Sequence, residues 1–234
     1  NAGYPVVLCN VDNFYMDLAY NHHPAEPGHY WGGFVNTRRA FTFAPFNVFS
    51  TTLTDRFRRP LDPARFEGME HLDPEARKHI KGLEGPIWSE TIKGNEMLEY
   101  YYLPKMLGLA QRAWSGQAAW ADIADREKRI EAINRDWSAF AYCIGYREMP
   151  RLDHIFGGYN YRLPAPGAIV QEGLLIVNVD FPGLSIRYTS DGSEPDANSP
   201  VYAGPLEANA TISLRSFDTR GRGSLTTVLD CTNR

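Results

Sequence analysis

The sequence predicts an α/β fold that is followed by a small all-β domain. Residues 5–10 are apolar and β-branched, which is typical of a short buried strand, and residues 95–114 and 128–146 carry the apolar periodicity of helices. After residues 161–167, which hold two prolines and a glycine, the pattern changes to short alternating strands. Since strands that alternate with helices indicate an α/β domain, we expect two domains, residues 1–163 and 164–234.

The composition excludes two classes of partner. The 234 residues are 43% hydrophobic, which is ample for a core, and 24 basic against 28 acidic residues give a net charge of −4. No basic tract is long enough to follow a nucleic-acid backbone, and no apolar run reaches membrane-spanning length. We therefore expect neither nucleic acid nor a membrane as a partner.

The histidines and cysteines predict no metal site. Cys9, Cys143 and Cys231 lie far apart and show neither metal-ligand spacing nor a disulfide framework. Cys9 and Cys143 have apolar neighbours, so we expect buried thiols there. The adjacent His22 and His23 are poor ligands, because neighbouring side chains diverge and no further ligand stands at metal spacing. We expect no cofactor.

The first strand, residues 5–10, shows no alternation of polar and apolar residues. We therefore expect it to be covered on both faces, as in a parallel sheet. The chain then turns, and Tyr15 and Asp17 follow two residues apart. Side chains at i and i+2 of an extended stretch project to the same side. An aromatic ring and a carboxylate would then lie together just past the C-terminal end of the strand.

The segment between the two predicted strands contains a long loop and a helix. The loop, residues 21–42, carries Trp31 among glycines and prolines. Aromatic residues in such a loop either line a ligand site or pack the loop against the domain. The helix is expected over residues 73–82, because Asp73 is a suitable N-cap and Gly82 is typical of a helix end.

A second apolar run, residues 85–88, predicts a strand that ends at Trp88, with Glu90 two residues on. This pair repeats the arrangement after the first strand. It suits a sugar ring, because tryptophan covers the C–H face and the carboxylate accepts from hydroxyls. On the spacing alone, however, a core tryptophan beside a solvated glutamate is the favoured alternative.

Two long helices are expected next. The periodicity covers residues 95–114, and Pro104 should break that helix near Leu103. Residues 128–146 form the second helix, with one apolar stripe. The second half of the first helix presents the apolar residues Met106, Leu107, Leu109, Ala110, Ala113 and Trp114.

The remaining residues predict a small β-sandwich. Short alternating runs are separated by turn signals such as Asp191-Gly192-Ser193. The strands are expected at residues 174–179, 184–189, 212–216 and 226–229.

Several widely spaced motifs together closely resemble bacterial β-N-acetylhexosaminidases of glycoside hydrolase family 20, especially the chitobiase branch. The tail, at residues 187–195, also resembles the small immunoglobulin-like domain that ends those enzymes. The resemblance covers nearly the whole chain. Its motifs are Tyr15-Met16-Asp17, Pro27-Gly28-His29-Tyr30-Trp31-Gly32, Gly85-Pro86-Ile87-Trp88-Ser89-Glu90, Leu98-Glu99-Tyr100 and Ala113-Trp114.

The resemblance implies the fold of the two domains. Residues 1–163 would be the C-terminal part of a (β/α)₈ TIM barrel, with residues 5–10 as the seventh strand and residues 85–88 as the eighth. Residues 164–234 would be the immunoglobulin-like β-sandwich. Enzymes of this branch are often periplasmic or secreted, and the resemblance implies the same location for this protein.

The resemblance also implies the chemistry, a substrate-assisted retaining hydrolysis of terminal β-linked N-acetylhexosamine from chitobiose or related glycans. In that scheme the 2-acetamido oxygen of the substrate attacks C1. Tyr15 would be the catalytic residue that holds this oxygen. The other matched residues would bind the substrate: Asp17 near O6, Trp88 under the terminal sugar, Glu90 at O4 and O6, and Trp31 on the next sugar.

The sequence departs from the family in two respects. The general acid of the family is a glutamate that directly follows an aspartate, and the chain contains no Asp-Glu pair. The first six barrel strands are also missing. We therefore expect the segment to be inactive alone, to need the remainder of the catalytic barrel as a partner, and to self-associate through exposed apolar surface.

The alternative hypothesis is a non-catalytic carbohydrate-binding or interaction module in which the sandwich is the working part. The tail has no tryptophan after Trp137. Its aromatic residues are Phe181, Tyr188, Tyr202 and Phe217, mostly at alternating positions that suit core packing. Packing is therefore the favoured role for them.

Overall fold

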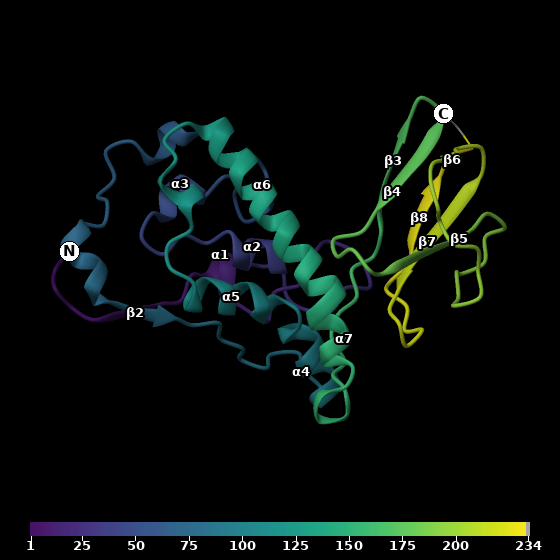
Figure 1. Ribbon diagram of the computed structural model, residues 1–234, viewed down its shortest axis with the longest axis horizontal. Coiled ribbons are helices and arrows are strands. Elements are labelled where there is room, and N and C mark those ends of the chain that lie inside the picture. The colour runs from purple at the N-terminus through teal and green to yellow at the C-terminus, as the bar shows by residue number, and fades with distance from the viewer. Residues whose placement is uncertain (233–234) are drawn as a thin grey trace. The chain divides into compact units, whose positions relative to one another are not determined.

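The computed structural model describes residues 1–232 of the chain, shown in Figure 1. The chain forms two compact units, which we call unit 1 (residues 1–137) and unit 2 (residues 138–234). Unit 1 is a mixture of helices with one small sheet, and unit 2 begins with helix and continues as strands. An α/β segment followed by β-structure is therefore confirmed, and the expected domain boundary between residues 163 and 164 stays a prediction.

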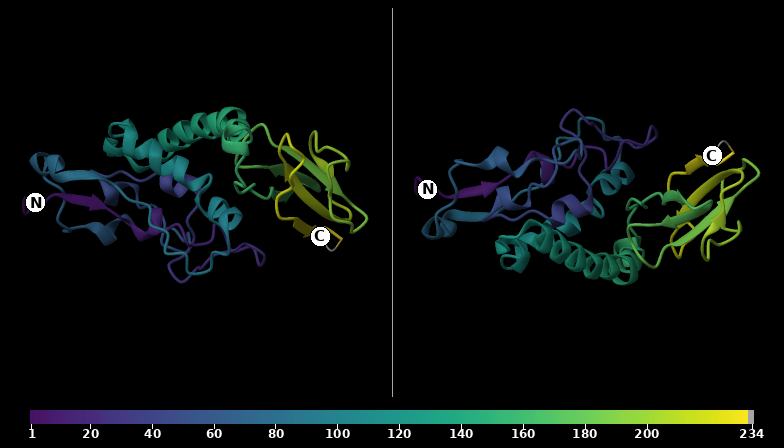
Figure 2. Two further views of the ribbon diagram at one scale, coloured as in Figure 1. Left: turned by 90° about the horizontal axis from the view of Figure 1, so that it is seen from below. Right: turned by 90° about the horizontal axis from the view of Figure 1, so that it is seen from above.

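A two-stranded parallel sheet opens unit 1. It consists of β1 (Val6–Leu8) and β2 (Ile80–Leu83), which lie side by side in both views of Figure 2. A strand within residues 5–10 is thus confirmed, but its expected burial on both faces is wrong. Val6 is 45% exposed and Val7 is 50% exposed, because β1 has a single neighbour among the described strands.

The three cysteine thiols differ in their exposure to solvent. Cys9 lies just past β1 and is exposed, so its expected burial is wrong, whereas Cys143 is half-buried and Cys231 is buried. Partial burial, together with the charge of Glu84, raises the pKa of the Cys9 thiol. All three cysteines are free.

The second strand lies five residues earlier in the sequence than expected. The predicted strand at residues 85–88 is wrong, because β2 ends at Leu83 and the chain beyond it runs without ladder pairing. Pro86 offers no N–H to a ladder, and its carbonyl instead accepts from the backbone N–H of Met16 at 2.9 Å. A Cβ on Gly85 would lie 2.6 Å from the end of the Met16 side chain, which would have to move to make room.

The expected helix over residues 73–82 is also shorter than predicted. A 3₁₀ helix, η2 (Pro74–His79), takes its first part, and Gly82 lies inside β2 rather than at a helix end. The other short helices of unit 1 are α1 (Val11–Phe14), α2 (Thr37–Phe41), α3 (Val48–Thr51), η1 (Pro63–Phe66) and η3 (Ala119–Asp122).

The break at Pro104 is confirmed: α4 (Asn95–Tyr102) ends there and α5 (Lys105–Trp114) begins. α5 packs closely on α2, and Gly108 allows this close approach. A Cβ at that position would lie 2.5 Å from the carbonyl oxygen of Thr37. The buried side of α5 consists of Lys105, Gly108 and Arg112. The apolar residues expected on this helix are therefore only partly buried, since Met106 is 43% and Trp114 is 91% exposed.

The second long helix is confirmed as α6 (Arg126–Cys143), which crosses from unit 1 into unit 2. It continues through a π-helical turn, η4 (Ile144–Glu148), α7 (Met149–Leu152) and a short 3₁₀ turn, η5 (Ile155–Gly157). Within residues 1–232, none of the helices combines the length and the apolarity that a bilayer-spanning helix requires.

Unit 2 contains two antiparallel three-stranded sheets. All four expected strands are confirmed within one or two residues. The sequence interpretation missed the strand that follows the proline-rich linker and a strand of two residues. One sheet has the order β3 (Gly167–Gln171), β4 (Leu174–Asn178), β6 (Leu206–Glu207), and the other has the order β5 (Ser185–Thr189), β7 (Thr211–Phe217), β8 (Thr227–Asp230).

The two sheets share one apolar core. Leu175 of β4 and Leu214 of β7 are both fully buried, and Tyr188 and Tyr202 pack against the same cluster. Phe181 and Phe217 are also buried. The aromatic residues of the tail are therefore packing residues, as their alternation predicted.

Candidate functional site

Two segments of unit 1 meet at the surface through a hydrogen bond between Tyr15 and Glu90. The Tyr15 hydroxyl donates to Oε1 of Glu90 over 2.7 Å. Tyr15 is the C-cap residue of α1, which follows β1, and Glu90 follows β2. Because the two strands are parallel, the segments that leave their C-terminal ends lie at the same edge of the sheet.

This contact changes the acidity of the phenol. The hydrogen bond to Glu90, with smaller contributions from partial burial and from the Glu90 charge, raises the pKa of Tyr15 to about 12. The phenolate would face a carboxylate at close range, which disfavours the ionised form. Tyr15 is therefore a neutral hydrogen-bond donor over the whole physiological pH range.

Asp17 lies beneath these two residues and is fully buried. Its carboxylate accepts from the backbone N–H of Trp88 at 2.6 Å and from that of Glu90 at 3.3 Å. The two site segments are thus joined by a buried anion as well as by the surface contact. The expected role of Asp17 as a direct sugar ligand stays a prediction, because its carboxylate points at the protein backbone here.

A buried lysine supports the same segment from α5. The Nζ atom of Lys105 donates to the carbonyl oxygens of Met16, at 3.0 Å, and Leu18, at 2.5 Å. The ammonium also lies 4.1 Å from the centre of the Tyr20 ring. Lys105 is fully buried, so its positive charge sits close to the buried Asp17 segment. Sequence reasoning missed this residue, since it counted only the apolar positions of the helix.

His29 is the second residue that sequence reasoning missed. Its Nε2 atom lies 3.1 Å from Oε2 of Glu90, the oxygen that Tyr15 leaves open, and each of the two side chains is 36% exposed. The only available signal was its place within the Gly28-His29-Tyr30-Trp31 motif. The Glu90 carboxylate therefore has a separate partner on each oxygen.

Two exposed indole rings belong to the same two segments. Trp31 contacts Tyr15 edge to face, with ring centres 5.3 Å apart, and is 53% exposed. Trp88 is 67% exposed and lies two residues before Glu90 in the sequence. Exposed tryptophans beside hydrogen-bonding polar groups suit a ligand with both apolar and hydroxylated faces. We call Tyr15, His29, Trp31, Trp88 and Glu90 the site rim.

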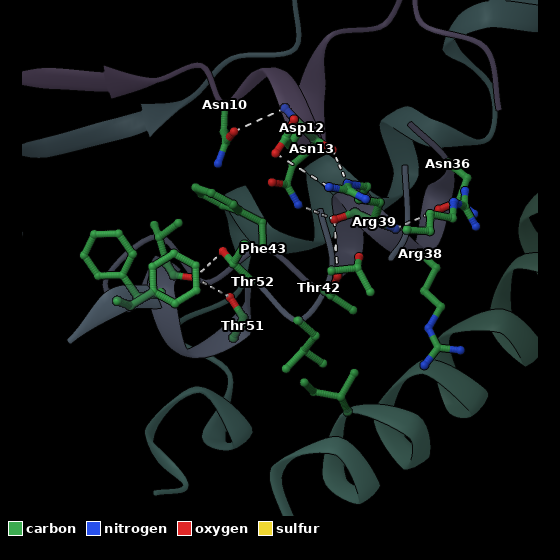
Figure 3. Close-up of a pocket in the computed structure, with 17 residues that line it drawn as sticks. Asn10, Asp12, Asn13, Asn36, Arg38, Arg39, Thr42, Phe43, Thr51 and Thr52 are labelled. Carbon is green, nitrogen blue, oxygen red and sulfur yellow. Dashed lines mark hydrogen bonds and ion pairs between the residues drawn. The ribbon is translucent and has the colours of Figure 1, made fainter. Parts of the chain in front are cut away.

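Another hollow of unit 1 lies apart from this rim. A cavity of about 500 Å³ is lined by residues of α1, α2 and α3, among them Asp12, Asn13 and Arg39 (Figure 3). Burial lowers the pKa of Arg39, which pairs with Asp12 at 3.6 Å. None of the expected site residues lines this cavity, so its shape carries no information about them.

The described residues contain no cluster of three His, Cys, Asp or Glu side chains that could hold a metal ion. The rim itself consists of a phenol, a carboxylate, an imidazole and two indoles.

Comparison with known families places both parts of the chain. The sequence model described as the catalytic domain of glycosyl hydrolase family 20 matches residues 1–117. The model described as the chitobiase/beta-hexosaminidase C-terminal domain matches residues 148–226. The two matches therefore follow the order of the two units.

Curated relatives cover nearly the whole chain. The chain is 35% identical over 231 residues to an N,N'-diacetylchitobiase of Vibrio harveyi, and this match covers 94% of the chain and 25% of that protein. The chain is also 31% identical over 242 residues to a beta-hexosaminidase of Vibrio vulnificus, and this match covers 95% of the chain and 27% of that protein. The chain thus spans about a quarter of the length of these relatives.

A solved structure also matches, that of a GH20 exo beta-N-acetylglucosaminidase from Vibrio harveyi in complex with N-acetylglucosamine. The match has a TM-score of 0.41 and 22% sequence identity, and it covers 68% of this chain and 19% of that one.

Proposed function

The chain belongs to glycosyl hydrolase family 20, and we propose that it is the part of a β-N-acetylhexosaminidase that holds the terminal amino sugar. The reaction is removal of terminal β-linked N-acetylhexosamine from chitobiose or related glycans. The observation that carries this proposal is the 2.7 Å contact of Tyr15 with Glu90, which brings two sequence motifs to one rim. The relatives named chitobiase and beta-hexosaminidase support the choice of substrate.

Trp88 and Glu90 would bind the terminal sugar. The exposed indole of Trp88 offers an apolar face to the C–H face of the ring. The carboxylate of Glu90 accepts hydrogen bonds from O4 and O6, because an ionised carboxylate is an acceptor on both oxygens. Trp31, exposed beside Tyr15, would stack on the next sugar.

Tyr15 would hold the acetamido group of the substrate. In the substrate-assisted reaction the acetamido oxygen attacks C1 while the glycosidic C1–O bond breaks and the leaving oxygen is protonated, which gives an oxazolinium intermediate. The acetamido oxygen must therefore be oriented before the new bond forms. A phenol whose pKa is raised to about 12 keeps its proton and can donate to that oxygen. Tyr15 has a single O–H, so the substrate must displace Glu90 as its acceptor.

Asp17 would act mainly through the two residues that it fixes. Its buried carboxylate orients the backbone at Trp88 and Glu90, so these side chains keep their place without substrate. A direct contact with O6 would require Asp17 to exchange one of these N–H groups for the hydroxyl.

The chain would act together with the remainder of a catalytic barrel. The parallel pairing of β1 with β2 supports β1 as part of the seventh strand of a TIM barrel and moves the proposed eighth strand from residues 85–88 to β2. The shared core of unit 2 supports an immunoglobulin-like sandwich. A proton donor for the leaving oxygen would come from outside this chain, since Tyr15 orients the acetamido group and no Asp-Glu pair occurs in the sequence.

Binding of N-acetylglucosamine, followed by tryptophan fluorescence, tests the proposal. We expect a saturable change for the unaltered chain and at least a tenfold weaker affinity for Trp88→Ala. Trp114→Ala is the matched control, because Trp114 is also exposed and lies outside the rim. A fluorescence change that does not saturate, or that survives Trp88→Ala unaltered, would refute the proposed site.

A further inference from the structure

Glu90 has two side-chain partners from different parts of the chain, a hydrogen-bond donor, Tyr15, and an ion-pair partner, His29. Tyr15 Oη lies 2.7 Å from Oε1, and His29 Nε2 lies 3.1 Å from Oε2. One partner on each oxygen fixes both the position and the plane of a carboxylate, whereas a single partner would let it rotate.

The backbone places the imidazole firmly. The N–H of His29 donates to the carbonyl oxygen of Asp17 at 3.0 Å, and the carbonyl oxygen of His29 accepts from the N–H of Ala19 at 2.7 Å. Gly28 permits this close approach: its φ is +119°, and a Cβ there would lie 2.8 Å from the Ala19 nitrogen. The position of His29 over Glu90 is therefore built into the fold of the loop.

Substrate binding changes the balance between the two donors. An ionised carboxylate offers about four lone-pair positions, two on each oxygen, of which Tyr15 and His29 each use one. When Tyr15 turns to the acetamido oxygen, as the proposed function requires, His29 is the one of these two partners that remains beside Glu90. The carboxylate then depends on His29 for its orientation.

We infer that His29 is a positioning residue that fixes the Glu90 carboxylate for the 4- and 6-hydroxyls of the bound sugar, and so sets the discrimination between N-acetylglucosamine and its 4-epimer, N-acetylgalactosamine. This inference rests on the proposed function. A fixed carboxylate meets O4 in one orientation only, whereas a freely rotating one can follow either epimer. The relative named N,N'-diacetylchitobiase indicates that N-acetylglucosamine is the epimer that fits.

The contact itself is tested without any sugar. The ¹⁵N NMR signals of the imidazoles are recorded for the unaltered chain and for Glu90→Gln. We expect the Nε2 signal of His29 to shift when the carboxylate is replaced, while the signal of His154, an exposed histidine of unit 2, stays in place. An unchanged His29 signal would overturn the inference.

The specificity is tested by titrating both sugars against His29→Ala, His29→Gln and the control His154→Ala. Loss of one polar contact to the charged Glu90 should weaken N-acetylglucosamine binding roughly 3- to 30-fold and N-acetylgalactosamine binding less, so that the ratio of the two affinities falls. His29→Gln should recover most of this ratio, because its amide can donate to the same oxygen.

Two outcomes separate this inference from the proposed function. If His29→Ala weakens both sugars equally, or if His29→Gln rescues nothing, His29 has only a structural role and the inference is refuted. If the unaltered chain binds neither sugar, the proposed function fails and so does the assigned specificity, even where the imidazole signal still reports the contact.

Discussion

The phenol of Tyr15 donates to the carboxylate of Glu90 over 2.7 Å, although 75 residues separate them in the sequence. The contact joins the segment after β1 to the segment after β2 and sets the acidity of the phenol. It therefore gives a direct measure of whether the site rim is assembled in solution.

The first prediction concerns this acidity. Replacing Glu90 by Gln removes the negative charge and the strongest acceptor near the phenolate, so the pKa of Tyr15 should fall from about 12 towards its ordinary value of 10. The measurement is a pH titration of the Tyr15 ring by NMR. Glu75→Gln, at a residue 95% exposed and outside the site, should leave the titration unchanged. A Tyr15 pKa near 10 in the unaltered chain would mean that the two residues do not meet.

The second prediction concerns Asp17. An asparagine can accept one of the two backbone N–H groups, but its own amide hydrogens then face the other donor. We expect Asp17→Asn to lower the free energy of unfolding by about 1–3 kcal/mol, measured by urea denaturation. The exposed Asp180 provides the control Asp180→Asn, which should change this free energy by less than about 0.5 kcal/mol.

The same variant separates two roles of Asp17. If Asp17 acts by holding the backbone, its loss should broaden the NMR signals of Trp88 and Glu90 in the absence of sugar. Sharp, unshifted signals together with weaker sugar binding would instead favour a direct contact between Asp17 and the substrate.

The third prediction concerns the buried ammonium of Lys105. Lys105→Met keeps the length of the side chain but leaves the carbonyl oxygens of Met16 and Leu18 without this donor. We expect a loss of about 1–3 kcal/mol in the free energy of unfolding, measured by urea denaturation. Lys128→Met, at an exposed position of α6, should be nearly neutral. Equal stability of the two variants would contradict a supporting role for Lys105.

The rim could be predicted in part, because strand ends of parallel strands share one edge and the motifs after them carry recognisable residues. The exact position of the second strand could not be predicted. Pro86 has no N–H for strand pairing, and its carbonyl oxygen accepts a hydrogen bond from the backbone N–H of Met16 instead. Such a contact joins residues 70 positions apart and leaves no local periodic signal. Val6 and Val7 show the same limit, since apolar composition predicts burial only when a partner is present to cover the residues.

Lys105 and His29, which support the site, were missed for a related reason. Periodicity assigns burial to apolar residues, yet α5 buries Lys105 and Arg112, whose charges face carbonyl oxygens and aromatic rings from distant segments. The guanidinium of Arg112 lies 4.6 Å from the centre of the Phe41 ring. His29 depends in turn on the close approach that Gly28 allows, which the sequence alone cannot register.

The fourth prediction is that the isolated chain self-associates. Val6 and Val7 of β1 are about half exposed on a strand with one described neighbour, and an open apolar edge promotes pairing with another chain. Light scattering should give a mass that rises with concentration, and Val7→Lys should reduce this rise. Val228→Lys, at an exposed valine of β8, is the control. A monodisperse monomer at all concentrations would contradict the prediction.

The fifth prediction is that the isolated chain does not turn over a chromogenic N-acetylglucosaminide. The rim can orient the acetamido group, but a positioned acid that protonates the leaving oxygen typically raises the rate by about 10²–10⁴-fold. Tyr15 cannot supply that proton while it holds the acetamido oxygen. Addition of a separately produced barrel segment that carries an Asp-Glu pair should restore activity, and Tyr15→Phe in this chain should abolish that restored activity. Turnover by the pure chain alone would show that a proton donor is already present in it.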